Sequence, residues 1–174
     1  MAQRIIAIGG TPGSGKTTLM LKVLDNFKGK LRTFSYKNLR GMHSKEDNLY
    51  ILGVYDGSTF SGTDKLAMNV FPHFTSFLSK VPEAVVLFEG NRLFVPKLFD
   101  NHECDILVVR ADSDLIQQRF VNRGSNQPER FLKAVKTKTE RIIAKYPSTI
   151  LHNNNEEDLE RNTQHILSLI HEQN

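Results

Sequence analysis

The sequence predicts an α/β domain in which a parallel sheet is covered by helices on both faces. Short apolar runs alternate with longer amphipathic segments along the 174 residues, and the first run leads straight into a glycine-rich loop. Strands that alternate with helices favour right-handed crossovers, which produce a parallel sheet with helices on either side. Neither a repeat nor a linker interrupts this pattern, so we expect a single domain over residues 1–174.

Five apolar runs are the expected strands of this sheet. They cover residues 4–8, 31–36, 84–88, 105–109 and, as a shorter strand, 149–152. Five segments with helical spacing of apolar residues are the expected helices, at residues 17–27, 64–80, 113–123, 128–146 and 156–170. The last helix has a clear start, because Asn155 is a good N-cap and three acids follow it at residues 156–158.

The glycine-rich loop after the first strand is a complete G-x-x-x-x-G-K-[ST] motif. Its glycines let backbone N–H groups surround an anion, and the helix that follows adds the positive end of its dipole. Lys16 can reach the β- and γ-phosphates of a nucleotide, and the Thr17 hydroxyl can ligate Mg²⁺. We therefore predict that a nucleoside triphosphate binds to the loop and the start of the helix, at Gly10, Thr11, Pro12, Gly13, Ser14, Gly15, Lys16, Thr17 and Thr18.

Glu89 and Arg92 follow the third apolar run, at the tip of a buried strand. Ligands of open α/β sheets bind outside the carboxyl ends of the strands. A carboxylate at that position can hold Mg²⁺ together with Thr17, or orient an acceptor. Arg92 is a candidate contact for a phosphate or for the acceptor. The alternative is that Glu89 is a strand-end acid without a catalytic role.

Two arginines, Arg119 and Arg123, lie four residues apart on one expected helix and therefore share a face. The planar guanidinium group suits phosphate oxygens and the charge that develops during phosphoryl transfer, so both are candidate catalytic residues. A solvated helix face is the plainer interpretation. The helix at 128–146 is rich in lysine and arginine, which indicates either a solvated face or a surface for nucleic acid.

The least regular part of the sequence is the insertion at residues 41–64, which we expect to hold the acceptor. A strand or hairpin arm fits residues 50–55, and turn-forming residues follow it. Asp56 and Asp64 are the acids of this segment. Asp64 can cap the following helix, or it can accept the proton of an alcohol that attacks the γ-phosphate.

The composition excludes several classes of protein. No apolar run approaches the roughly 18 residues that span a membrane, and run 5–8 is too short for a signal peptide. One cysteine, Cys104, cannot form an internal disulfide, and the six histidines lack metal-ligand spacing. We expect a cytoplasmic protein without a membrane partner. The net charge of +4 and the pI near 9.2 are compatible with a polyanionic partner.

The sequence resembles the nucleoside and nucleotide kinases among the P-loop NTPases in four features taken together. These are the phosphate loop, the strand-tip Glu89, the arginine pair and the ending at residues 150–154. The resemblance implies a parallel five-stranded sheet, ATP as the donor and adenine near the loop of the last strand. It also implies a mobile lid at residues 119–130 that carries Arg119 and Arg123.

A narrower resemblance lies in residues 50–66, which look like the phage kinases that phosphorylate 5-hydroxymethyluracil within DNA. It implies a host-cytoplasmic enzyme with ATP, Mg²⁺ and DNA as partners, no required protein partner, and an acceptor site at Tyr55, Asp56, Thr63, Asp64 and Arg92. The proton acceptor stays open between Asp56, Asp64 and Glu89. A kinase of free deoxynucleotides is the alternative, and a nucleotide-regulated ATPase or binding module is a third interpretation.

Overall fold

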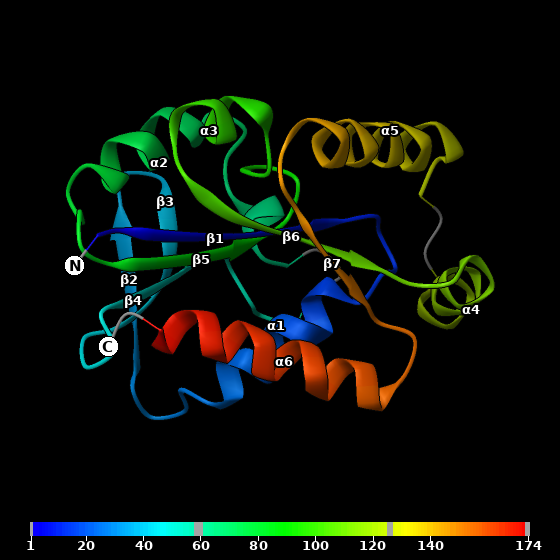
Figure 1. Cartoon of the computed structure of the whole chain (residues 1–174), viewed down its shortest axis with the longest axis horizontal. Coiled ribbons are helices and arrows are strands. Elements are labelled where there is room, and N and C mark those ends of the chain that lie inside the picture. Colours follow the sequence, from blue (N-terminus) through cyan, green and yellow to red (C-terminus); the bar gives the residue numbers. More distant parts are fainter. Residues whose placement is uncertain (1, 58–60, 125–126, 173–174) are drawn as a thin grey trace.

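The computed structural model describes residues 2–57, 61–124 and 127–172. One seven-stranded sheet runs through the molecule in the order β2-β3-β4-β5-β1-β6-β7 (Figure 1). The strands are β1 Arg4–Gly10, β2 Leu31–Tyr36, β3 Leu39–Ser44, β4 Leu49–Leu52, β5 Val85–Glu89, β6 Cys104–Arg110 and β7 Thr149–His152. The α/β class and the mostly parallel sheet are confirmed.

The predicted count of five strands is wrong. Five strands, β4-β5-β1-β6-β7, pair in parallel, but β2 and β3 extend this sheet as an antiparallel hairpin. Residues 31–36 were expected as a buried strand, yet they form the half-exposed edge, with Arg32, Thr33 and Ser35 facing solvent. The parallel strand that pairs with β5 is instead β4, which lies inside the insertion at 41–64.

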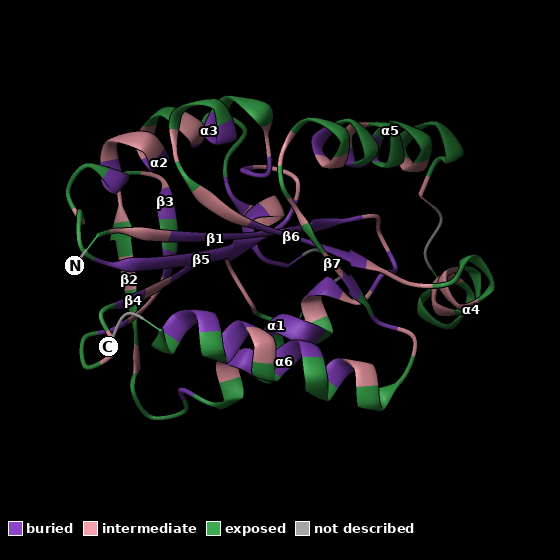
Figure 2. Cartoon of the chain, in the orientation of Figure 1, coloured by how far each residue is buried: buried purple, intermediate pink, exposed green. Residues whose placement is uncertain are grey.

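Helices cover both faces of the sheet (Figure 1). The helices α1 Lys16–Asp25 and α6 Glu156–His171 enclose one hydrophobic core, and α2 Phe71–Leu78, α3 Pro96–Asn101 and α5 Glu129–Lys145 enclose the other. The remaining helix, α4 Ser113–Arg123, has no buried residue and lies at one end of the sheet, as Figure 2 shows. It therefore depends little on the two cores.

The helix predicted at 64–80 is wrong in its first part. Residues Thr63–Lys65 form a single 3₁₀ turn, Leu66 is extended, and α2 begins only at Phe71. Tertiary contacts override the helical pattern here, because the Thr63 hydroxyl donates to the backbone carbonyl of Glu89 at 2.9 Å. The short helix α3 was not predicted, since six residues give too little periodicity.

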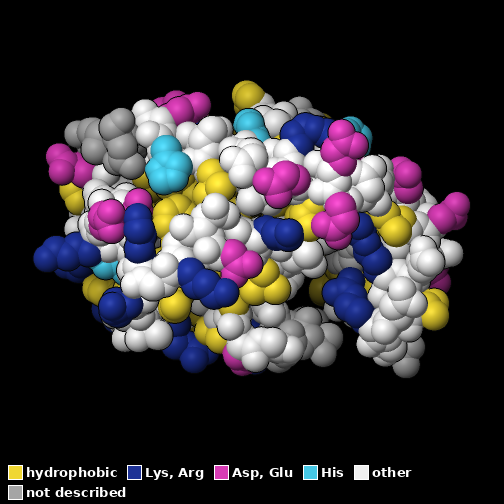
Figure 3. All heavy atoms as spheres, turned by 90° about the horizontal axis from the view of Figure 1, so that it is seen from below, with side chains coloured by type: hydrophobic (Ala, Val, Ile, Leu, Met, Phe, Trp, Pro, Cys, Tyr) yellow, Lys and Arg dark blue, Asp and Glu magenta, His cyan; other side chains and the backbone are white. Residues whose placement is uncertain are grey.

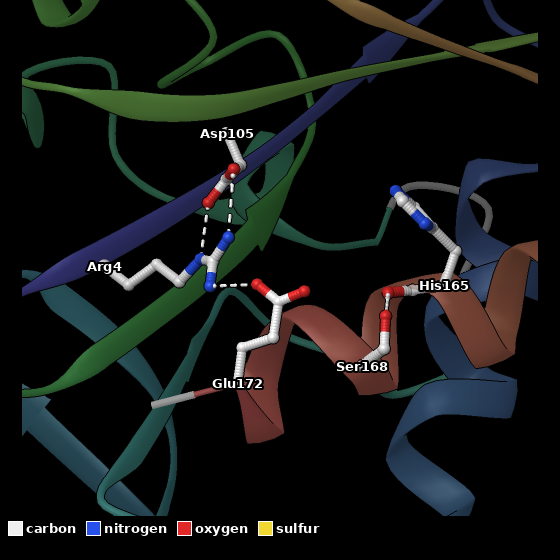
Figure 4. A network of polar contacts seen from close by, with 5 residues as sticks. All are labelled: Arg4, Asp105, His165, Ser168 and Glu172. Atoms are coloured by element: carbon white, nitrogen blue, oxygen red, sulfur yellow. Dashed lines mark hydrogen bonds and ion pairs between the residues drawn. The ribbon is translucent and has the colours of Figure 1, made fainter. Parts of the chain in front are cut away.

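Arg4 fixes the end of the sheet at which β1 begins, opposite the carboxyl ends of the parallel strands. Its guanidinium donates to both carboxylate oxygens of Asp105, at 2.6 and 3.3 Å, and to Glu172 at 2.7 Å (Figure 4). A bidentate contact of this kind fixes geometry as well as adding energy. The start of β1 is thereby tied to β6 and to the end of α6. Among the described residues, no helix is long and apolar enough to cross a membrane.

Candidate active site

A cleft of about 1320 Å³ lies at the carboxyl ends of the parallel strands. Its walls come from the loop at 10–17, the strand tip at 89–92, α4, the start of α5 and the turn after β7. Figure 3 views the molecule from the side of α1 and α6 and shows a hollow in this face, with Lys and Arg side chains beside it. The volume exceeds the 300–1,000 Å³ of a typical small-ligand site.

The loop at 10–17 takes the conformation that its glycines allow. Gly10, Gly13 and Gly15 have positive φ values of 141°, 82° and 98°. Gly15 is also required by packing, because a Cβ there would collide with the side-chain amide of Asn153. Backbone of this shape, leading into the N-terminus of α1, is the arrangement that binds phosphate.

Lys16 lies at the floor of the cleft, with a relative exposure of 9%. Its Nζ donates to the carbonyl oxygens of Gly10 at 2.7 Å and Thr11 at 3.0 Å. Burial lowers the pKa of the amine, while the nearby carboxylates Glu89 and Asp64 raise it. The loop therefore holds the ammonium group of Lys16 in place through these two carbonyls, next to the backbone that could surround an anion.

Glu89 faces this loop from the neighbouring strand. The register of β5 on β1 pairs Glu89 with Ile8, two residues before the loop begins. Burial raises the pKa of Glu89 to about 7, and Asp64 contributes to the rise, whereas Lys16 and hydrogen bonds from Tyr55 and Thr17 oppose it. The Tyr55 hydroxyl donates to Oε1 of Glu89 at 3.2 Å. A carboxyl group with a pKa near neutrality suits proton transfer.

Thr17 and Glu89 form an oxygen pair that could hold Mg²⁺, because the Thr17 hydroxyl lies within hydrogen-bonding reach of the carboxylate. No group of three or more His, Cys, Asp or Glu side chains among the described residues is placed to hold a metal ion by itself. Magnesium in nucleotide sites needs no such cluster, since it uses one or two carboxylates and completes its shell with water and phosphate oxygens. The residues present therefore fit this ion.

Asp64 and Arg92 meet at the opposite wall of the cleft. The backbone N–H of Arg92 donates to Oδ1 of Asp64 at 3.0 Å, and its guanidinium donates to the Asp64 carbonyl at 3.2 Å. Asp64 therefore shapes the 90–92 turn as well as facing the cleft. One carboxylate can serve both purposes, because its second oxygen is not used in this contact.

Three of the predicted acceptor residues do not line the cleft. Thr63 is fully buried behind Glu89, and Tyr55 packs behind the same carboxylate. Asp56 is exposed, and its carboxylate pairs with Lys65 at 2.7 Å. Residues 58–60, which belong to the insertion and to the resembling segment, lie outside the described residues.

The two arginines of α4 line the cleft but act differently. Arg119 donates to the carbonyl oxygens of Gly13 and Asn153, each at 2.9 Å, and so ties α4 to the loop. Arg123 is exposed and lies over the ring of Phe120, 5.9 Å from its centroid. Residues 125 and 126 of the predicted lid lie outside the described residues.

Two further cleft residues, Asn153 and Gln127, were not named as site residues, although they fall within the ending at 150–154 and the lid at 119–130 that the family resemblance pointed to. Asn153 is buried and its amide donates to the carbonyl of Ser14 at 3.0 Å. Three buried side-chain atoms have no hydrogen-bond partner among the described residues, and all belong to the loop or to the cleft wall: Ser14 Oγ, Arg92 Nε and Gln127 Oε1. Buried polar atoms are rarely left unpaired, so their grouping here indicates a ligand site. Only spatial proximity reveals this, because they are far apart in sequence.

A scan of the chain against models of known protein families finds no match, and a search of curated proteins finds no match either.

Proposed function

We propose that this chain is an ATP-dependent phosphotransferase of the P-loop NTPase class with an alcohol as acceptor. The observation that carries the proposal is a pair of buried charged residues beside a loop of three positive-φ glycines: Lys16 at the start of α1 and Glu89 at the tip of β5. Lys16 would contact the transferring phosphoryl group, as the lysine of the motif does. Thr17 and Glu89 would hold Mg²⁺, which neutralises charge on the phosphates when it is bound.

Arg119 supports the donor side of this proposal. Its hydrogen bonds to Gly13 and Asn153 hold the phosphate loop against the turn after β7, where the family resemblance implies adenine. Arg123 has no such anchor within the described residues apart from its position over Phe120, so its guanidinium is available to phosphate oxygens. Arg123 could therefore stabilise the negative charge that develops on the phosphoryl group during transfer, next to Lys16, which the loop holds in place.

For the acceptor we propose the hydroxymethyl group of 5-hydroxymethyluracil in DNA. The support is the resemblance of residues 50–66, the basic balance of the chain and the size of the cleft. Of the three acids considered as proton acceptor, Asp56 lies outside the cleft wall and pairs with Lys65. We therefore assign proton acceptance to Asp64 or Glu89, which both face the cleft.

The test supplies ATP labelled at the γ-phosphate to a panel of acceptors. The panel holds DNA with 5-hydroxymethyluracil, the same DNA with thymine, and free deoxynucleotides. Label is expected only in the first. Label on a free nucleotide would promote the nucleotide-kinase alternative, and release of inorganic phosphate without any labelled acceptor would favour the ATPase alternative.

A further inference from the structure

The helix α5 is one of the strongly basic segments of the chain. α5 carries six lysine and arginine side chains and two acids, which gives it a net charge of +4. The whole chain has 23 basic and 19 acidic residues and the same net charge of +4. The remainder of the chain therefore balances, with 17 residues of each sign. A net charge of +4 on one helix makes its exposed face a candidate site for an anionic partner.

Four of the six cations of α5 line a groove that is separate from the cleft. The groove has a volume of about 540 Å³ and lies between α5 and Pro96, at the start of α3. The α5 residues that line it recur at helical spacing, so they form one face: Arg130, Lys133, Ala134, Thr137, Lys138 and Arg141. The face turned to the core carries Val135, Thr139 and Ile142 instead.

None of the four cations that line the groove forms an ion pair with an acid among the described residues. They are Arg130, Lys133, Lys138 and Arg141. Glu140, an acid of the same helix, is already paired with Arg110 at 2.6 Å. Like charges in a row repel one another, and a polyanion relieves that repulsion while releasing its own counterions.

The groove adjoins the cleft. Lys138, which lines the groove, donates from Nζ to the carbonyl of Asn91 at 2.9 Å, and Asn91 lines the cleft. Phe131, next to Arg130 in sequence, also lines the cleft and has a relative exposure of 46%. From Arg130 to Arg141 the helix rises about 16 Å, close to the axial length of five nucleotides of a B-form strand.

We propose that the α5 groove binds the sugar–phosphate backbone of a DNA strand and presents one of its bases to the cleft. The single file of cations fits a linear polyanion better than a flat anionic membrane. The exposed ring of Phe131 at the cleft mouth provides a surface on which a base can stack. The presentation of a base rests on the proposed function, whereas strand binding by the groove can be measured without it.

The test measures binding of a fluorescein-labelled single-stranded oligothymidylate by anisotropy, in the absence of ATP. The variant is Arg130→Gln/Lys133→Gln/Arg141→Gln. The control is Lys22→Gln/Lys45→Gln/Lys80→Gln, which removes the same charge from residues that line neither the groove nor the cleft. Calorimetric ATP binding, expected to be equal in both, shows that the fold is retained. Should the triple variant not fold, Lys133→Gln/Arg141→Gln takes its place.

Removing three phosphate contacts should reduce the slope of log K against log salt by about 2, at about 0.7 per contact for a single strand. Between about 50 and 200 mM salt, the wild type and the control should then lose about 20-fold more affinity than the triple variant. The charge-conserving variant Arg130→Lys/Arg141→Lys should keep the wild-type slope.

Equal affinity and slope in the triple variant and the control would overturn the proposal, as would a difference seen with anionic lipid vesicles but not with DNA. The proposed function can fail separately. Groove-dependent binding without phosphate on any base would leave the groove assignment standing and remove the kinase assignment. Phosphate on the base without groove-dependent binding would leave the kinase assignment standing and remove the groove assignment.

Discussion

Replacing Glu89 with glutamine is expected to change activity and stability in opposite directions. Burial raises the pKa of Glu89 from 4.5 to about 7, so ionisation is less favourable in the folded protein than in the unfolded chain. The stability that this group contributes is therefore fully present below pH 4.5 and is lost as the pH rises to about 7. At 1.36 kcal/mol per pKa unit, the loss is about 3 kcal/mol.

The glutamine side chain has nearly the same shape but no charge, so it avoids this loss. We expect Glu89→Gln to unfold at the same urea concentration as the wild type near pH 4.5. At about pH 8 the variant should be more stable by up to about 3 kcal/mol. Lys16 loses a counter-charge in the variant, which offsets part of the gain. Urea unfolding across this pH range measures the difference.

Phosphate transfer by Glu89→Gln should fall on the order of 100-fold, as for a carboxylate that binds metal or moves a proton. The control is Glu46→Gln, which removes an exposed carboxylate paired with Lys30 and should leave both activity and stability nearly unchanged. A loss of activity below about threefold would refute the catalytic assignment of Glu89. A stability difference that does not vary with pH would refute the reasoning on its burial.

Three further substitutions test the site. Lys16→Met should abolish transfer but keep the fold, measured by thermal unfolding, and a near wild-type rate would defeat the assignment. Gly15→Ala, which combines a φ of 98° with a collision, should lose ATP affinity in calorimetry and about 1–3 kcal/mol of stability. Gly29→Ala, with φ 82° and no atom within 4 Å, should lose less, and equal losses would contradict the packing argument. Asp64→Asn should suppress transfer to DNA while ATP binding survives, whereas Asp56→Asn should leave both intact; the reverse would reassign the acid.

The parts of the fold that could be predicted are those with a local signal. The runs at 4–8, 84–88 and 105–109 are apolar on both faces and become β1, β5 and β6 at the centre of the sheet. Residues 31–36 contain alternating polar side chains, which fit a half-exposed edge strand better than the parallel strand expected there. The strand or hairpin arm expected at 50–55 overlaps β4, which covers Leu49–Leu52 and therefore starts and ends earlier than expected.

In the candidate site, too, some residues could be predicted from a local sequence signal and others are brought together only by the fold. The loop at 10–17 could be identified from its sequence because the motif and its conformation are local. Glu89 could be placed because the tips of parallel strands meet at one edge of a sheet. Asn153, Gln127 and Phe131 come from distant segments, and their meeting at the cleft depends on strand order and on the path of α5.

Mass analysis of the acceptor base tests the central claim most directly. DNA that contains 5-hydroxymethyluracil is incubated with the protein, ATP and Mg²⁺, and is then digested to nucleosides. We predict that the 5-hydroxymethyluracil nucleoside gains the mass of one phosphoryl group, and that this product is absent with Lys16→Met. Phosphate found only at a DNA 5′ end or on a free nucleotide, with the base unchanged, would contradict the account.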